Sequence, residues 1–233
     1  MQLLCWWRSE GKHIGKHGAG TGTEKTIYTP RGQSDDAPAF AYLVKTRCLD
    51  PKVVSVFARR HMIYEDAKYH NAVFVGFDVD GIPRHAHKRG TCQRGKPFKG
   101  NVESCDPRYS FHWIGKSDTV YVFEAPIDML SFISMYQKDW MGHSYVALCG
   151  VAEHALVQLL EDVPHLSKIT LCLDHDKAGI EAGERIKKRL SERGYRNVFP
   201  LFSCQKDWNE DLQALQKPPP EFVAECQTVT QMM

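Results

Sequence analysis

The second half of the chain alternates short apolar runs with amphipathic stretches. Four runs rich in β-branched and aromatic residues predict strands over 119–123, 145–149, 169–173 and 197–202. Apolar residues at helical spacing predict the intervening helices over 127–137, 152–160 and 177–193. This strand–helix succession predicts an α/β fold with a mostly parallel sheet and helices on both faces. Such sheets place their functional sites at the carboxyl ends of the strands.

A different pattern precedes this region. An apolar face at helical spacing predicts a short helix from Pro38, and Asp50 with Pro51 supplies an N-cap and first-turn proline for a second helix through Met62. Residues 71–78 predict a strand that turns at an Asp-Gly pair and returns over 83–88. Together these elements predict a small α+β unit.

The predicted organisation has four parts. The opening residues are rich in Gly, Lys, His, Thr and Ser without hydrophobic periodicity, and they contain no GxxxxGK[ST] phosphate-binding sequence. The predicted divisions are a flexible arm or linker at 1–36, a basic α+β subdomain at 37–116, an α/β domain at 117–215 and a tail at 216–233.

Charge is unevenly distributed along the 233 residues. The total of 30 Lys and Arg against 28 Asp and Glu gives a net charge of +2. Residues 1–116 carry 19 basic and 11 acidic side chains, whereas residues 117–233 carry 11 and 17. The basic half predicts a polyanion partner, and the acidic half predicts either carboxylates with a special role or a solvated surface.

The eight cysteines contain no CxxC pair, so the sequence predicts no structural zinc. Several lie within apolar runs, where a free thiol behaves as a small buried hydrophobe, and this usage favours a reducing cytoplasm. No run of 18 apolar residues and no secretory signal is present. We therefore expect a cytoplasmic protein without a membrane partner.

One segment concentrates positive charge. Residues 82–102 contain no acidic residue. The unopposed charges, with Phe98 among them, favour contact with a nucleic-acid backbone over a solvated basic loop. The predicted nucleic-acid-binding residues are Arg84, Lys88, Arg89, Arg94, Lys96 and Lys99.

Acidic residues follow two of the predicted strands. Glu124 follows 119–123, and Asp174 and Asp176 follow 169–173. Residues two apart in an extended segment project to the same side, so the two aspartates can converge, and Glu124 joins them if the strands are neighbours. Like charges this close require a cation, and oxygen ligands suit Mg²⁺ or Mn²⁺. The alternative is that these acids cap the helices that follow.

A further polar cluster, KDWNEDL, follows the fourth predicted strand. Lys206, Asp207 and Asn209 within it are predicted supporting residues that complete the same rim. The alternative role of this segment is a helix N-terminus with a tryptophan anchor.

At this point the sequence resembles a known family. The segments VFEAPIDMLSF, ALCGVA, LCLDHDKAGIEAGERI and KDWNEDL look like a Toprim domain, the fold shared by bacterial primases, topoisomerases and some nucleases. The resemblance implies that Glu124, Asp174 and Asp176 are catalytic and metal-binding. It also implies that Asp128 and Asp207 are supporting acids.

The resemblance extends upstream and covers roughly residues 38–215. AYLVKTRCLDPKVVSVF and VFVGFDVDGIPRHAHKRGT are similar to the subdomain that precedes Toprim in bacterial primases, and closer to an uncharacterised domain fused to Toprim in proteins of plasmids and integrative elements. It implies that Arg89 and Lys99 contact nucleic acid or nucleotide. The chain departs from the primase pattern at Ala125, usually Gly, at Asn209, often Asp, and in lacking the amino-terminal zinc module.

Three functions remain open. The leading one is Mg²⁺-dependent, primase-like nucleotidyltransfer on a DNA template in mobile-element replication or transfer, with nucleoside triphosphates as substrates and a helicase or other mobile-element protein as partner. The alternatives are a Toprim nuclease that cleaves DNA or RNA, and a non-catalytic nucleic-acid-binding module. A topoisomerase is not expected, because strand passage needs a nucleophilic tyrosine on an additional domain.

Overall fold

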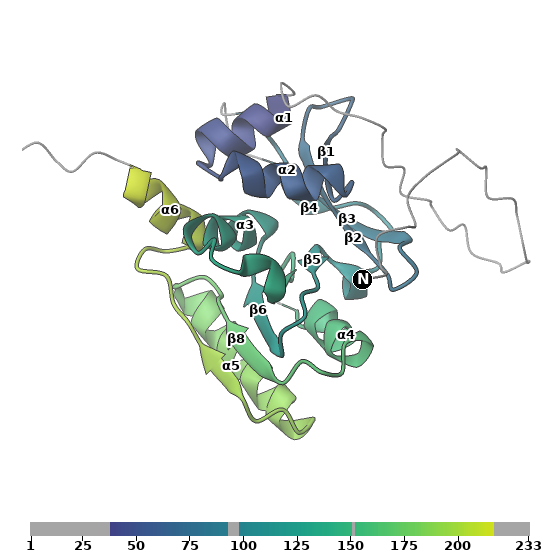
Figure 1. The fold of residues 1–233 in the computed structure, drawn as a ribbon, viewed down its shortest axis with the longest axis vertical. Coiled ribbons are helices and arrows are strands. Elements are labelled where there is room, and N and C mark those ends of the chain that lie inside the picture. The colour runs from purple at the N-terminus through teal and green to yellow at the C-terminus, as the bar shows by residue number, and fades with distance from the viewer. Residues whose placement is uncertain (1–37, 93–97, 151, 217–233) are drawn as a thin grey trace, which may run out of the picture.

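Two β-sheets organise the chain in the computed structural model, which describes residues 38–92, 98–150 and 152–216 (Figure 1). The predicted arm at 1–36 lies outside the described residues, as does the predicted tail apart from Gln216. Arg94 and Lys96 lie outside them too. None of the described helices is long and apolar enough to cross a membrane.

The first sheet is antiparallel and has the order β1-β2-β3-β4. Its strands are β1 (Ile63–Glu65), β2 (Ala72–Phe77), β3 (Pro83–Arg89) and β4 (Lys99–Asn101). β2 and β3 form the predicted hairpin. Its turn is closed by Asp78, whose Oδ1 accepts hydrogen bonds from the backbone N–H groups of Asp80 and Ile82, and Gly81 adopts a φ of +76° there.

Helices cover one side of this sheet. They are α1 (Pro38–Ala41), continued by the π turn η1 (Tyr42–Thr46), and α2 (Pro51–Arg59). The predicted start of α2 is confirmed, since Asp50 Oδ1 accepts from the backbone N–H groups of Lys52 and Val53. The predicted end at Met62 is three residues too late. His61 has a φ of 57°, and this left-handed residue turns the chain out of the helix.

The second sheet has the order β5-β7-β6-β8-β9. Its strands are β5 (His112–Trp113), β6 (Thr119–Phe123), β7 (Ser144–Ala147), β8 (Lys168–Leu171) and β9 (Val198–Pro200). The four predicted strands are parallel, as expected, and β5 adds an antiparallel edge that makes the sheet mixed. β6 and β8 are direct neighbours, the arrangement on which the predicted approach of Glu124 to Asp174 depends.

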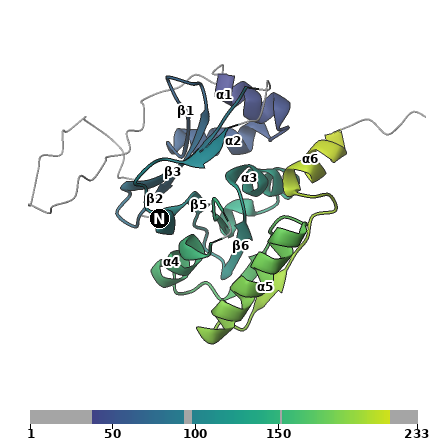
Figure 2. The same cartoon turned by 180° about the vertical axis from the view of Figure 1, so that it is seen from behind.

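Helices pack on both faces of this sheet, as predicted. They are α3 (Pro126–Met135), α4 (His154–Asp162), α5 (Lys177–Glu192) and α6 (Trp208–Gln216), with 3₁₀ turns η2 (Pro107–Tyr109) and η3 (Trp140–Gly142). Val120 and Val122 of β6 pack in one core with residues of α4 and α5, whereas Tyr121 and Phe123 pack against the core on the α3 and α6 side. The view from behind shows α5 running alongside the sheet (Figure 2).

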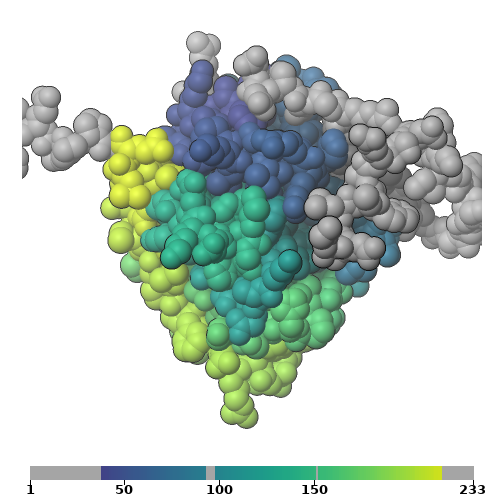
Figure 3. Space-filling model, in the orientation of Figure 1, coloured from purple at the N-terminus to yellow at the C-terminus, as the bar shows by residue number. Residues whose placement is uncertain are grey.

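One aromatic core joins the two sheets. Phe57 of α2 lies 5.3 Å from Phe111 and 5.6 Å from Trp140 between ring centroids, and Phe74 of β2 meets the edge of Phe111. The space-filling view shows the two parts pressed together (Figure 3). This shared core fixes the first sheet over the carboxyl ends of the parallel strands. The division into domains at residues 116 and 117 stays a prediction.

Candidate functional site

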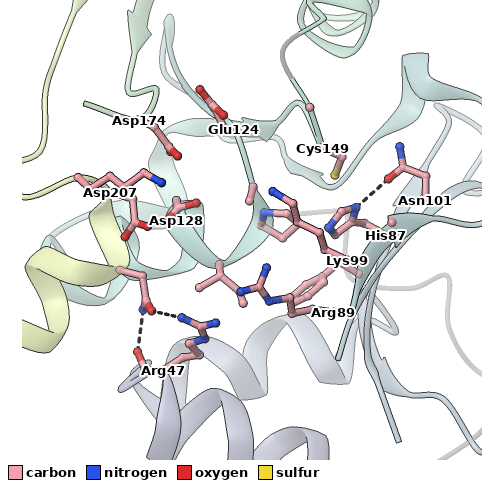
Figure 4. Close-up of a pocket in the computed structure, with 18 residues that line it drawn as sticks. Arg47, His87, Arg89, Lys99, Asn101, Glu124, Asp128, Cys149, Asp174 and Asp207 are labelled. Atoms are coloured by element: carbon pink, nitrogen blue, oxygen red, sulfur yellow. Dashed lines mark hydrogen bonds between the residues drawn. The ribbon is translucent and has the colours of Figure 1, made fainter. Parts of the chain in front are cut away.

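A cavity of about 410 Å³ lies where the first sheet faces the carboxyl ends of β6 and β8 (Figure 4). One wall comes from the first part of the chain and carries Arg47, His87, Arg89 and Lys99. The opposite wall comes from the second part and carries Glu124, Asp128, Asp174 and Asp207. The cavity is therefore basic on one side and acidic on the other.

Glu124 and Asp174 are brought together by the pairing of β6 with β8. Burial raises the pKa of Asp174 to about 7, helped by the negative charge of Glu124. Burial likewise raises the pKa of Glu124, with a smaller contribution from Asp176. Oε1 of Glu124 and Oδ1 of Asp174 are buried and have no hydrogen-bond partner among the described residues. Two half-buried carboxylates thus lie close together, and each has one buried oxygen that a cation could compensate.

Asp176 stands at the start of α5 and is close enough to Glu124 and Asp174 for its charge to raise the pKa of both acids. It caps α5, with its Oδ1 accepting from the backbone N–H of Gly179 at 3.0 Å, and this hydrogen bond is the main cause of its lowered pKa. Its Oδ2 lies 3.7 Å from Nζ of Lys206. Asp176 does not line the cavity wall, because it is the N-cap of α5, which begins at Lys177. The helix-cap alternative is therefore observed for this residue, and its predicted role at a metal ion stays a prediction.

The tight turn into α5 depends on Gly179. A Cβ atom at this position would lie 2.1 Å from the carbonyl oxygen of Asp174. Only glycine lets the helix approach the strand end this closely, so Gly179 sets where the Asp174 carboxylate stands.

Asp128 and Asp207 complete the acidic wall. Asp128 projects from α3 and is buried, and burial raises its pKa well above the usual range, with further contributions from Asp207 and Asp174. Asp207 caps α6, since its Oδ1 accepts from the backbone N–H of Glu210 at 2.7 Å. Buried Trp208 donates from Nε1 to the carbonyl of Cys172 at 2.9 Å and anchors α6 beside β8. The cap-and-anchor alternative for this segment is thus observed, and it also places Asp207 in the cavity.

The acidic wall can be tested for its fit to a divalent cation. Its donors are carboxylate oxygens, which suit Mg²⁺ or Mn²⁺, and the unpartnered oxygens of Glu124 and Asp174 with their raised pKa values are what a cation would compensate. Within the described ranges, no group of three or more His, Cys, Asp or Glu side chains is arranged to hold a metal. The residues fit such an ion chemically, with Glu124 and Asp174 as the central pair.

Side chains alternate between the two faces of β3, and this alternation decides which basic residues reach the cavity. Arg89, and Lys99 opposite it on β4, reach the cavity. Arg84 and Lys88 belong to the other alternation of the strand; Arg84 pairs with Asp78 at 2.7 Å and Lys88 with Asp66 at 2.9 Å. The structure thus brings two of the four described basic residues to the site and places the other two away from it.

Arg89 and Lys99 are available for an anionic ligand. Neither forms an ion pair with a described residue, and Nε of Arg89 is buried without a hydrogen-bond partner among them. Lys99 is close enough to Glu124 to lower the pKa of that acid. A phosphate placed between the walls would satisfy the arginine and meet the lysine.

Arg47 is a cavity residue that the sequence analysis did not single out. Its Nε donates to the Tyr42 hydroxyl at 2.7 Å, its guanidinium lies over the Tyr42 ring, and its Nη1 donates to Oδ1 of Asn209 at 3.2 Å. The only signal was its place in the segment resembling primases, because helical periodicity does not distinguish a cavity arginine from a solvated one. Asn209, predicted as a supporting residue, therefore joins the two parts of the chain.

Lys206 and Cys149 also line the cavity. Lys206 was predicted as a supporting residue, and Cys149 was interpreted only as a buried thiol. Burial raises the pKa of Cys149 to about 12, so the thiol is neutral and is not a nucleophile.

Two protein families match successive parts of this chain. Residues 121–212 match the family described as Toprim-like, and residues 41–117 match a family described as a protein of unknown function, DUF3991. The resemblance of residues 121–212 to Toprim is thus confirmed, and the segment that precedes them is similar to DUF3991.

Two curated proteins are similar in sequence to part of this chain. An uncharacterised protein of Bacillus anthracis, pXO2-78, is 24% identical over 198 residues, which are 76% of this chain and 57% of the relative. An uncharacterised protein of Mycoplasma genitalium, MG010, is 30% identical over 97 residues, covering 41% of this chain and 42% of the relative. The chain thus spans about half the length of the curated relatives it matches.

Solved structures with a similar fold are primase cores. The primase fragment of the bacteriophage T7 primase-helicase protein has a TM-score of 0.54 at 18% identity, covering 71% of this chain and 66% of that one. The DnaG primase catalytic domain bound to ssDNA has a TM-score of 0.53 at 14% identity, covering 79% and 72%. The Escherichia coli primase catalytic core gives 0.52 at 14%, covering 78% and 70%. The fold is that of a primase catalytic core.

Proposed function

We propose that this chain carries out Mg²⁺- or Mn²⁺-dependent, primase-like nucleotidyltransfer on a nucleic-acid template. The observation that carries the proposal is the cavity itself, in which Arg89 and Lys99 lie on the wall opposite the half-buried Glu124 and Asp174, and each of these acids has one oxygen without a hydrogen-bond partner among the described residues. Nucleotidyl transfer needs both walls. The phosphates of the nucleotide bind to basic side chains of the protein, whereas the metal ions that accompany those phosphates bind to its carboxylates.

Each wall has its own task. Glu124 and Asp174 would hold the metal, with Asp128, Asp207 and Asp176 shaping the surrounding negative field. A bound divalent ion supplies charge compensation on the triphosphate and on the attacking oxygen. Arg89 and Lys99 bind the phosphates of template or nucleotide, and Arg47 is held ready by Tyr42 and Asn209. Catalysis then rests on positioning charged groups.

The partners follow from the same proposal. The template is single-stranded DNA or RNA, the substrates are nucleoside triphosphates, and a helicase or another mobile-element protein acts alongside. One structural neighbour is bound to ssDNA, and another is part of a primase-helicase protein. The mobile-element setting is supported by the resemblance to Toprim proteins of plasmids and integrative elements.

Template-dependent primer synthesis tests the proposal. We expect the purified protein to join labelled nucleotides into a primer on a single-stranded template with Mg²⁺ or Mn²⁺. The double variant Asp174→Ala plus Asp176→Ala should lose this activity. The matched control is Glu181→Ala plus Glu192→Ala, which removes two exposed acids from α5. Synthesis that persists in the Asp174 and Asp176 variant would overturn the proposal, and shortening of labelled DNA without nucleotides would reassign the chemistry to a nuclease.

One observation favours a second function, a non-catalytic nucleic-acid-binding module. No group of three metal-binding side chains is preformed in the described part of the chain, and Asp176 is used as a helix cap. Calorimetric titration with Mn²⁺ separates the two functions. Heat that disappears in Glu124→Ala contradicts a metal-free module, whereas oligonucleotide binding without any metal heat supports it.

A further inference from the structure

His87 is an uncharged side chain on the cavity wall that also carries Arg47, Arg89 and Lys99, and one of its two ring nitrogens has no hydrogen-bond partner among the described residues. It lies on β3 and is nearly buried. Its Nδ1 is 2.7 Å from Oδ1 of Asn101, its partner in the register of β3 with β4. Figure 4 shows this pair beside Lys99.

The Asn101 contact fixes what the other ring nitrogen can do. A carbonyl oxygen only accepts hydrogen bonds, so Nδ1 of His87 carries the proton. Burial, and then the positive charges of Arg89 and Lys99, lower the pKa of His87 against the opposing effect of Asn101, which keeps the ring neutral at pH 7. Nε2 therefore presents a lone pair, and it has no hydrogen-bond partner among the described residues.

The charged side chains of this wall cannot supply such an acceptor, and Oδ1 of Asn101 is engaged with His87. Arginine and lysine are donors only, so Arg47, Arg89 and Lys99 suit the oxygens of phosphate. A ligand that contacts His87 must instead offer a hydrogen. In a nucleotide, the group next to the phosphate is the sugar, and its hydroxyl groups are hydrogen-bond donors.

The spacing on β3 matches this chemistry. His87 and Arg89 are two residues apart on one strand face, roughly 7 Å along the chain. A sugar bridges about that separation between its phosphate and its hydroxyl groups. A phosphate on Arg89 therefore leaves the sugar of the same nucleotide beside His87.

We propose that Nε2 of His87 accepts a hydrogen bond from a sugar hydroxyl of the nucleotide bound in this cavity, with Asn101 as the positioning residue that fixes the ring. The inference rests on the proposed function, since it requires a nucleotide in the cavity. The inference adds to the proposed function a residue that determines which nucleotide sugars bind.

Calorimetric titration with ATP, 2′-deoxy-ATP and 3′-deoxy-ATP in Mg²⁺ tests the inference. We expect the wild type to bind one of the deoxy nucleotides roughly three- to tenfold more weakly than ATP, the size of one hydrogen bond. In His87→Phe, which fills the volume without an acceptor, that ratio falls to about one. His87→Gln keeps an acceptor and restores part of the preference, and Asn101→Ala reduces it.

Lys99→Ala is the matched control from the same wall. This substitution should weaken the binding of all three nucleotides by a common factor and leave the ratios of their affinities unchanged, because Lys99 contacts the phosphates and not the sugar. A wild type that binds the three nucleotides equally, or a ratio that persists in His87→Phe, overturns the inference and leaves the proposed function standing. A wild type that binds none of them overturns both.

Discussion

Asn209 and Arg47 form two hydrogen bonds with each other that join the two parts of the chain. Oδ1 of Asn209 accepts from Nη1 of Arg47 at 3.2 Å, and its Nδ2 donates to the backbone carbonyl of Arg47 at 2.8 Å. The same amide donates to Oγ of Ser131 and accepts from Nε2 of Gln213. An amide is the only group of this size that makes all four contacts, which explains why this chain has Asn where primases often have Asp.

Asn209→Asp should therefore destabilise the protein. The substitution removes both N–H donors and sets a carboxylate against the Arg47 carbonyl, at a position that is only 3% exposed. We expect a loss of about 1–3 kcal/mol in the free energy of unfolding, measured in urea. Asn197→Asp, on an exposed loop, is the control and should stay close to wild type. Equal stability of the two variants would contradict the joining role of Asn209.

Two glycines of α5 should respond oppositely to alanine. Gly179→Ala places a methyl group 2.1 Å from the Asp174 carbonyl oxygen, so it should destabilise the protein and displace Asp174. At Gly183 the nearest atom is 3.8 Å away, and alanine there should stabilise by about 0.4–1 kcal/mol through helix propensity. Thermal unfolding checks both variants. Similar changes in melting temperature would argue against the close approach of α5.

His85 should make a contribution to stability that is lost on acidification, opposite in sign to the contributions of Asp128 and Asp174, whose pKa values are raised. Burial, followed by the nearby His87, lowers the pKa of this ring from 6.5 to about 4, so the unfolded chain takes up its proton first as the pH falls. The contribution of His85 is complete above pH 6.5 and declines toward pH 4, by at most about 1.4 kcal/mol per pH unit.

Urea unfolding of wild type and His85→Leu between pH 7 and 4.5 measures this dependence. The change in the free energy of unfolding from pH 7 to pH 4.5 should be more favourable to the folded state in the variant than in the wild type, and His154→Gln, at an exposed site, should keep the wild-type dependence. An NMR titration of the wild type should show a His85 midpoint near 4. A midpoint at the ordinary value of 6.5 would refute the expectation.

Nucleic-acid binding should depend on salt through the cavity lysine. Removing one phosphate contact with Lys99→Ala should make the slope of log K against log salt less negative by about 0.7–0.9. Lys188→Ala, on the exposed side of α5, should leave the slope unchanged. Fluorescence anisotropy with a labelled single strand between 50 and 200 mM salt, concentrations at which such contacts weaken strongly, provides the measurement. Identical slopes would exclude Lys99 as a phosphate contact.

The sequence predicts the parallel sheet well because every one of its strands is a run of apolar residues. Alternation along β6 and its pairing with β8 place Glu124 near Asp174 without further information. The two-residue strand β5 carries no such period, so it was missed. The capping hydrogen bond of Asp176 could not be predicted with the same ease, because its partner, the backbone N–H of Gly179, is in place only once α5 has formed.

The basic wall was harder to predict than the acidic one. Six basic residues in one segment look equivalent in the sequence. Because successive side chains of β3 point to opposite faces of the sheet, Arg89 reaches the cavity and Lys88 pairs with Asp66. The register of β3 with β4, which pairs His87 with Asn101, is a tertiary property. Arg47 depends on contacts with Asn209, 162 positions later in the chain.

The central claim is that the acidic wall holds a divalent ion for nucleotide chemistry, and a crystal structure with Mn²⁺ and a nucleoside triphosphate tests it most directly. We predict an anomalous Mn²⁺ peak within coordination distance of the Glu124 and Asp174 carboxylates, with the phosphates toward Arg89 and Lys99. The same experiment on Glu124→Gln should lose the peak. A nucleotide bound in the cavity with no Mn²⁺ at Glu124 and Asp174, or a peak only elsewhere, would contradict the account.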